Sequence, residues 1–383
     1  MRQVRAALRR VPALSSRDGG PVDSMPPAGA DDSERFDAGL DARVRAFQQE
    51  RGLVVDGVVG QETWAALQAA GRRLGDRPLS YAVSRPHSGD DVAELQRRLT
   101  GMGFDVGRED GVFGSRTERA LQAFQRERGL SGDGICGALT LGELARLRHS
   151  VRGGNAHELR EAERLRRSGP SLVGRTVVVD AGHGGDDAGF TASGLRERDV
   201  VADIVARLEG RRQVSGVTPV LTHGPLSGAS DVQRAAVANA SQADLLISLH
   251  TDGSTSPGPH GVATYYYGTG RDSPSVVGAR LAELVQKEVV ARTVLLDCRT
   301  HPKTWQLLRL TRMPAVRLEV GCLSNEGDAR LLRSGDFRDT VAEAILVAVQ
   351  RLFLPVELDA PTGALRMPVG FGGQPGRAAS PAR

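Results

Sequence analysis

Residues 176–185 read TVVVDAGHGG, an apolar strand that leads directly into a glycine-rich turn carrying His183. Two later apolar runs end in a similar way: LLISLH at 245–250 ends on a histidine, and AVRLEVG at 315–321 carries Glu319. Because side chains at the carboxyl ends of parallel strands converge on one crevice, we expect these three endings to meet. Two histidines and a carboxylate in one crevice are the parts of a catalytic zinc site.

The charge and cysteine content bound the class of protein. Lys and Arg number 50 against 46 Asp and Glu, and the sequence pI is about 9.3. The charges are interspersed, so nucleic acid is not expected as a partner. Three cysteines without a CxxC spacing favour a reducing compartment.

The amino terminus is basic but lacks the apolar stretch of a signal peptide, and no run of about 18 or more apolar residues predicts a transmembrane segment. The sequence as written therefore predicts a cytoplasmic protein. If the true start lies upstream, the cell envelope or secretion is expected instead.

An internal repeat occupies the first 150 residues. VRAFQQERGL at 44–53 matches LQAFQRERGL at 121–130, and an Asp-Gly pair follows each copy. Each copy predicts a helix, an Asp-Gly turn and a second helix. We expect one small all-α three-helix module at 1–76, truncated at its start and with an inserted loop at 16–35, and a second at 83–150.

The remaining chain predicts three further segments. Residues 151–172 form a linker with a helix at about 156–168. Strands and helices alternate over 173–354, which indicates an α/β domain with a mixed, mostly parallel sheet flanked by helices. Residues 355–383 carry Pro, Gly, Ala and Arg with little to bury and predict a disordered tail.

A catalytic zinc site has three protein ligands and an open position for water or substrate. His183 and His250 supply two, and Glu197, at the start of a predicted helix, is the best-placed third. Three nearby acids compete for this role on composition alone: Asp186, Asp187 and Asp199. Asp187, which is close to His183 in the sequence, is the fallback. The other histidines lie in predicted loops or on polar helices and are expected to be solvated: His87, His149, His157, His223, His260 and His301.

Glu319 is the expected proton carrier. It lies in an otherwise apolar run, where burial raises a carboxyl pKa toward values useful to a general base, and we assign it as base and later acid. Arg317 lies two residues before it on the same strand face, where its charge lowers that pKa. Other chemistries fit less well: no G-x-S-x-G elbow occurs, the glycines fail a dinucleotide fingerprint, and Cys322 needs a neighbouring histidine to act as a nucleophile.

The motifs DAGHGG at 180–185, ERD at 197–199, ADLLISLH at 243–250 and PAVRLEVGCLSN at 314–325 resemble those of the zinc-dependent N-acetylmuramoyl-L-alanine amidases. The resemblance implies Zn²⁺ as the cofactor and hydrolysis of the amide between N-acetylmuramic acid and L-alanine in peptidoglycan or muropeptides. It places the three zinc ligands on His183, Glu197 and His250. It places the catalytic glutamate on Glu319.

The repeats resemble the three-helix peptidoglycan-binding module, with GDDVAELQ at 89–96 and DGVFG at 110–114 as the clearest motifs. This implies peptidoglycan, a muropeptide or a lipid-linked precursor as ligand, and proteins of cell-wall synthesis as partners. An alternative function is therefore a cytoplasmic regulator of cell-wall synthesis that binds peptidoglycan precursor through a retained amidase fold.

Overall fold

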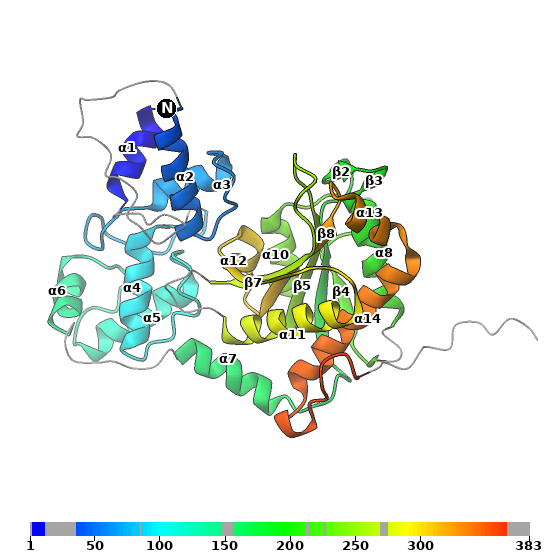
Figure 1. The fold of residues 1–383 in the computed structure, drawn as a ribbon. Coiled ribbons are helices and arrows are strands. Elements are labelled where there is room, and N and C mark those ends of the chain that lie inside the picture. The colour runs from blue at the N-terminus through cyan, green and yellow to red at the C-terminus, as the bar shows by residue number, and fades with distance from the viewer. Residues whose placement is uncertain are drawn as a thin grey trace, which may run out of the picture. The chain divides into compact units, whose positions relative to one another are not determined.

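The computed structural model describes residues 2–11, 36–84, 86–147, 156–211, 215–224, 227–268 and 275–365. The chain forms two compact units, whose elements are labelled in Figure 1. The first comprises Met1–Leu165, Tyr266–Val277 and Pro302–Arg312, and the second comprises the rest.

The sequence predicts a single boundary near residue 173 between the helical modules and the α/β domain. The two units do not divide at that point alone. Two segments from the predicted α/β range pack with the helical modules in the first unit. Arg108 donates to the carbonyl oxygen of Leu308 at 2.7 Å, and Lys303 donates to that of Leu53 at 3.0 Å. Such contacts between distant parts of the chain carry no local sequence signal.

Two three-helix modules make up most of the first unit. Each encloses its own apolar core, around Phe47 in the first module and around Phe113 and Phe124 in the second. The predicted inserted loop at 16–35 lies outside the described residues. The helices are α1 (Arg2–Arg10), α2 (Ala38–Glu50) and α3 (Gln61–Ala69), then α4 (Asp90–Gly101), α5 (Ser115–Glu127) and α6 (Ala138–Arg146).

A buried glutamine closes each Asp-Gly loop of the modules. Gln48 donates to Asp56 at 2.7 Å and to the carbonyl oxygen of Val58 at 3.0 Å, and its own oxygen accepts from the amide of Gly57 at 2.9 Å. The same arrangement recurs around Gln96 and around Gln125. The Phe-Gln and Asp-Gly motifs of the repeat are therefore explained by loop closure. The expected helix in the linker is present as α7 (Ala156–Arg167).

A six-stranded sheet forms the α/β domain, in the order β4-β1-β5-β8-β6-β7. β1 pairs in parallel with β4 and β5, and β5 pairs in parallel with β8. The amide of Gly321 donates to the carbonyl oxygen of Gly261, so β6 starts beside the end of β8 and runs antiparallel to it. The strands are β1 (Thr176–Ala181), β4 (Thr218–Leu221), β5 (Leu245–Asp252), β6 (Val262–Tyr267), β7 (Asp297–Lys303) and β8 (Ala315–Cys322), and β2 (Thr191–Ala192) and β3 (Leu195–Arg196) form a separate hairpin.

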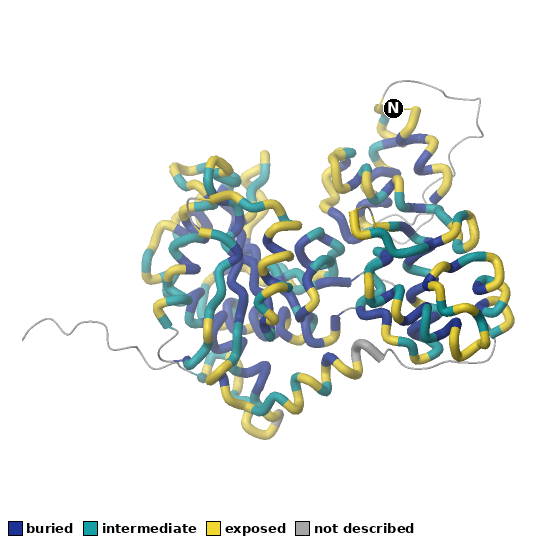
Figure 2. The backbone as a smooth tube through the Cα atoms, turned by 180° about the vertical axis from the view of Figure 1, so that it is seen from behind, coloured by how far each residue is buried: buried dark blue, intermediate teal, exposed yellow. Residues whose placement is uncertain are grey.

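The two faces of this sheet differ in chemistry. Val179 and Ile247 face Leu208 of α8 (Glu197–Gly210) and Ile345 of α14 (Gly335–Phe353). Successive side chains alternate across a strand. The neighbours of these residues on each strand, including Asp180 on β1, therefore point to the other face. The central strands β1, β5 and β8 are mostly buried, as the dark tube in Figure 2 shows. The remaining elements are α10 (Asp231–Ala240), α11 (Val276–Arg292), α12 (Gln306–Leu310), α13 (Glu326–Arg333) and η1 (Val356–Leu358).

The segment after α14 is held against the domain. Arg351 bonds Asp359 at 2.6 Å, and the fully buried Glu288 of α11 accepts from Arg351 at 2.5 Å and from the amide of Gly363. The prediction of disorder from 355 is therefore wrong for residues 355–365, whose polar groups bond these buried charges. Residues 366–383 lie outside the described residues. Among the described helices, none has the length and apolar character needed to cross a membrane.

Candidate metal centre and active site

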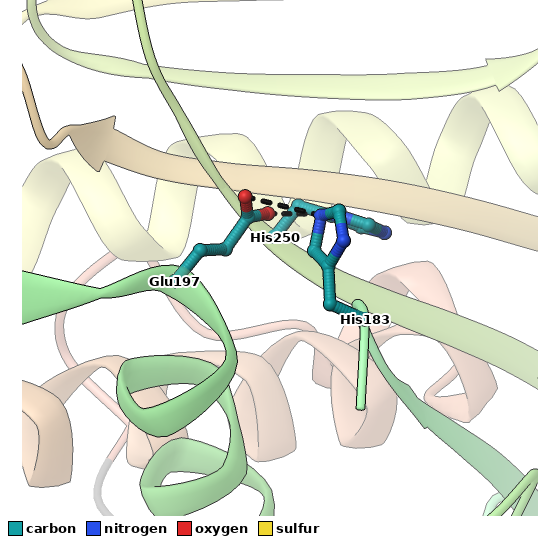
Figure 3. A group of neighbouring side chains, drawn as sticks. All are labelled: His183, Glu197 and His250. Atoms are coloured by element: carbon teal, nitrogen blue, oxygen red, sulfur yellow. Dashed lines mark hydrogen bonds and ion pairs between the residues drawn. The ribbon is translucent and has the colours of Figure 1, made fainter. Parts of the chain in front are cut away.

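Three side chains from three elements converge at the carboxyl end of the sheet (Figure 3). His183 follows β1, Glu197 is the first residue of α8, and His250 lies near the end of β5. Their candidate ligand atoms all lie within 4.8 Å of one another. Glu197 bridges the two rings, with Oε2 at 3.1 Å from Nε2 of His183 and Oε1 at 2.9 Å from Nδ1 of His250.

Two glycines leave the space that these side chains fill. A Cβ on Gly182 would lie 2.4 Å from the His250 ring. A Cβ on Gly189, which has a φ of 64°, would lie 2.6 Å from the ring of His183 and 2.7 Å from Oε2 of Glu197. Neither position has room for a side chain, so both glycines are required by the close packing of the three groups.

The electrostatics of this group suit a divalent cation. Burial opposes ionisation of Glu197, but hydrogen bonds from His183 and His250 outweigh it and hold the pKa of this carboxyl well below its usual range. Burial lowers the pKa of His250 to about 4, so its ring is neutral at pH 7. The hydrogen bond to Glu197 raises the pKa of His183. Two imidazoles and a carboxylate with an open side are the donor set that a catalytic Zn²⁺ takes, so these residues fit the ion.

Asp187, the fallback third ligand, does not join the group of three and instead lies behind the ring of His183. Its Oδ2 lies 2.7 Å from Nδ1 of His183, the ring nitrogen opposite the one that faces Glu197. A carboxylate there fixes the tautomer and direction of a ligating imidazole. Asp199 bonds Arg196 at 2.6 Å. Asp186, Asp187 and Asp199 all line a hollow beside the turn and lie outside the group of three.

Glu319 lies next to this group. Its Cα pairs with that of His250 across β5 and β8, and the residue is 9% exposed. Burial raises its pKa, and Arg317, whose Nη2 donates to Oε1 at 2.9 Å, opposes that rise. The hydroxyl of Tyr265 on β6 also hydrogen-bonds the carboxylate. Both sequence-based expectations for this acid, a pKa raised by burial and a counteracting Arg317, are confirmed.

The sequence reasoning missed Tyr265 and misjudged His223. The predicted solvated position of His223 is wrong, because its side chain is 5% exposed and Nε2 lies 2.9 Å from the carbonyl oxygen of Ala181. Burial follows from the pairing of β4 with β1, which brings the residues after both strands together. Cys322, the thiol considered as a nucleophile, is buried, with its sulfur 3.0 Å from the hydroxyl of Ser324.

The fold and the site define an α/β domain with a candidate metal centre of two histidines and a glutamate, in a chain that also carries two small helical modules. Residues 177–351 match the N-acetylmuramoyl-L-alanine amidase family, and residues 20–67 and 88–144 match the putative peptidoglycan binding domain. The chain is 48% identical to the N-acetylmuramoyl-L-alanine amidase CwlM of Mycobacterium tuberculosis, over 86% of this chain and 82% of the relative. It therefore belongs to the N-acetylmuramoyl-L-alanine amidase family.

More distant relatives match less than half of this chain. The amidase LytC of Bacillus subtilis is 33% identical over 45% of this chain and 34% of its own length. The crystal structure of an N-acetylmuramoyl-L-alanine amidase from Clostridium difficile 630 is 27% identical, covers 47% of this chain and 96% of its own, and has a TM-score of 0.43.

Proposed function

We propose that this chain is a zinc-dependent amidase that cleaves the bond between N-acetylmuramic acid and L-alanine in peptidoglycan or muropeptides. One observation carries the proposal: His183, Glu197 and His250 converge within 4.8 Å, and Glu319 pairs with His250 on the adjacent strand. The two modules are proposed to hold peptidoglycan, a muropeptide or a lipid-linked precursor while the second unit acts on it.

The residues have separate roles in this reaction. Zn²⁺ held by the three ligands would supply Lewis-acid polarisation of the scissile carbonyl and a lower pKa for the attacking water. Glu319 accepts the proton of that water and then delivers it to the leaving amine of L-alanine. Arg317 donates to Oε1 of Glu319 and the hydroxyl of Tyr265 also bonds this carboxylate, so both side chains orient the base. Asp187 keeps Nε2 of His183 directed toward the ion.

The test is to purify the chain, measure bound zinc and assay release of stem peptide from a muropeptide. Glu319→Gln keeps the shape of the side chain but removes the base, and is expected to lower kcat by about 10² to 10⁴ with zinc still bound. Glu326→Gln, at a side chain that is 88% exposed, is the matched control. A chain with no zinc and no product contradicts the enzyme proposal, and full activity in Glu319→Gln contradicts the role of the base.

A second function has one observation in its favour. The ion pair between Arg317 and Glu319 opposes the rise of the Glu319 pKa, and a less basic carboxylate accepts a proton less readily, which would slow turnover of a bound ligand. Such a chain would act as a cytoplasmic regulator that recognises peptidoglycan precursor and contacts proteins of cell-wall synthesis. Muropeptide binding with zinc present and no cleavage, in the same assay, supports this alternative.

A further inference from the structure

His183 has a backbone conformation that needs support. Its φ is 66°, in the left-handed region that residues with a Cβ disfavour. Gly184 and Gly185, which follow, also have positive φ values of 136° and 58°. A glycine-rich turn has little stiffness of its own. Contacts from outside the turn must therefore direct the ring of His183 toward Glu197 and His250.

Arg234 of α10 provides these contacts. Its Nη2 donates to the carbonyl oxygen of His183 at 3.1 Å, and its Nη1 donates to that of Ala181 at 2.9 Å. Its Nε donates to the carbonyl oxygen of Ala229 at 2.7 Å, and the residue is only 5% exposed. One planar guanidinium thus joins the turn that carries the ligand to the segment that leads into α10.

Asp180 fixes the guanidinium in turn. It is fully buried in β1, and its two oxygens accept from Nη1 of Arg234 at 3.1 and 3.2 Å. The hydroxyl of Ser248 on β5 donates to it at 2.6 Å, and the hydroxyl of Thr222, just after β4, donates from the other side. A buried ion pair is weak evidence for stability. The ion pair of Asp180 and Arg234 lies next to the turn that carries His183. This position indicates a role in placing His183 rather than in stability.

We propose that Arg234 is a positioning residue for the metal ligand His183, and that Asp180 orients Arg234 for this task. The inference rests on the proposed zinc site and extends it to two residues outside the ligand set. Asp187 acts on the ring of His183, whereas Arg234 acts on the backbone that places the ring. Outer contacts of this kind typically change metal affinity about 10- to 100-fold when they are removed.

The test uses Arg234→Lys, which keeps a positive charge opposite Asp180 but cannot bridge two carbonyl oxygens with a planar fork. The matched control is Arg351→Lys, the same change at a guanidinium that is 6% exposed and is paired with the buried Glu288 on other helices. Zinc affinity is measured by competition with a chromophoric chelator, and site geometry by the visible spectrum of the cobalt-substituted protein. Arg234→Lys is expected to bind zinc about 10- to 100-fold more weakly and to alter the cobalt spectrum. Arg351→Lys should match the unmodified chain in both.

Zinc affinity and a cobalt spectrum unchanged in folded Arg234→Lys overturn the inference, and so does an equal loss in Arg351→Lys, which would indicate a general effect of stability. If Arg234→Lys does not fold, Asp180→Asn decides, since it removes only the charge that orients Arg234. Weaker zinc binding in Asp180→Asn supports the inference, and unchanged binding overturns it. An unmodified chain that binds no zinc contradicts the proposed function itself, and the inference with it.

Discussion

Removal of zinc is expected to lower the thermal stability of the second unit. In His183→Ala, the Tm is expected to be the same with and without zinc. Glu197 lies 3.1 Å from Nε2 of His183 and 2.9 Å from Nδ1 of His250. The fold therefore brings the three donors together, whereas the unfolded chain does not. An ion that binds these donors binds the folded state only, so its binding free energy adds to the stability of that state.

The size of the effect follows from mass action. A ligand that binds only the folded state stabilises it by RT ln(1 + [L]/Kd), about 2.7 kcal/mol when free zinc is 100 times Kd. For a unit of roughly 200 residues, 1 kcal/mol changes Tm by about 2 to 4 °C. The expected rise in Tm is therefore about 5 to 11 °C at that zinc concentration.

The assay is calorimetry of the full chain at several buffered concentrations of free zinc, with a chelator to define the metal-free limit. His260→Ala is the control, since the side chain of His260 is exposed and bonds the nearby carbonyl oxygen of Gly258. It should keep the full zinc-dependent rise in Tm, whereas His183→Ala should lose it. A rise that persists in His183→Ala would refute the assignment, because zinc would then be binding at another place.

Three further outcomes are expected. Arg317→Met should move the acid limb of the pH profile of kcat/KM to higher pH: activity is lost as pH falls through the pKa of Glu319, and Arg317 opposes the rise of that pKa. Gly182→Ala should lower zinc stoichiometry while far-UV circular dichroism stays unchanged, because the new Cβ would lie 2.4 Å from the His250 ring. Glu288→Gln should lower stability by about 3–5 kcal/mol in thermal unfolding, because it removes the buried carboxylate charge that pairs with both Arg292 and Arg351; an unchanged Tm contradicts this.

The sequence indicated the chemical groups that follow or end strands and the acid that begins a helix, Glu197, but it gave no role to Tyr265 or Arg234. His183, His250 and Glu319 each follow or end an apolar run, so the convergence rule for parallel strands applies to them directly. Arg234 has no such signal, because it lies on a helix and reaches Asp180 across 54 residues of chain. Only the packing of α10 against the end of β1 brings the two together, and no local pattern reports that packing.

The modules show the same limit in another form. The offset comparison detected the loops closed by Gln48 and Gln125, which both lie eight residues before the aspartate they bond. It missed the equivalent loop at Gln96, where the spacing to Asp110 is 14 residues. The hydrogen bonds are the same in all three places, so the physical unit is the closed loop, while sequence alignment depends on loop length.

Arg317 acts on both a candidate metal ligand, His250, and the proposed proton carrier, Glu319. The sequence predicts that Arg317 lowers the pKa of Glu319, since a cation beside a carboxylate weakens its basicity. In the structure it acts on two groups: it helps burial to lower the pKa of His250, and it opposes the burial that raises the pKa of Glu319. The first effect keeps the imidazole neutral, as a ligand must be, and the second favours the ionised carboxylate that a base must be. One charge therefore promotes the required protonation state of both a metal ligand and the proton carrier, and its removal should raise the pKa of both groups together.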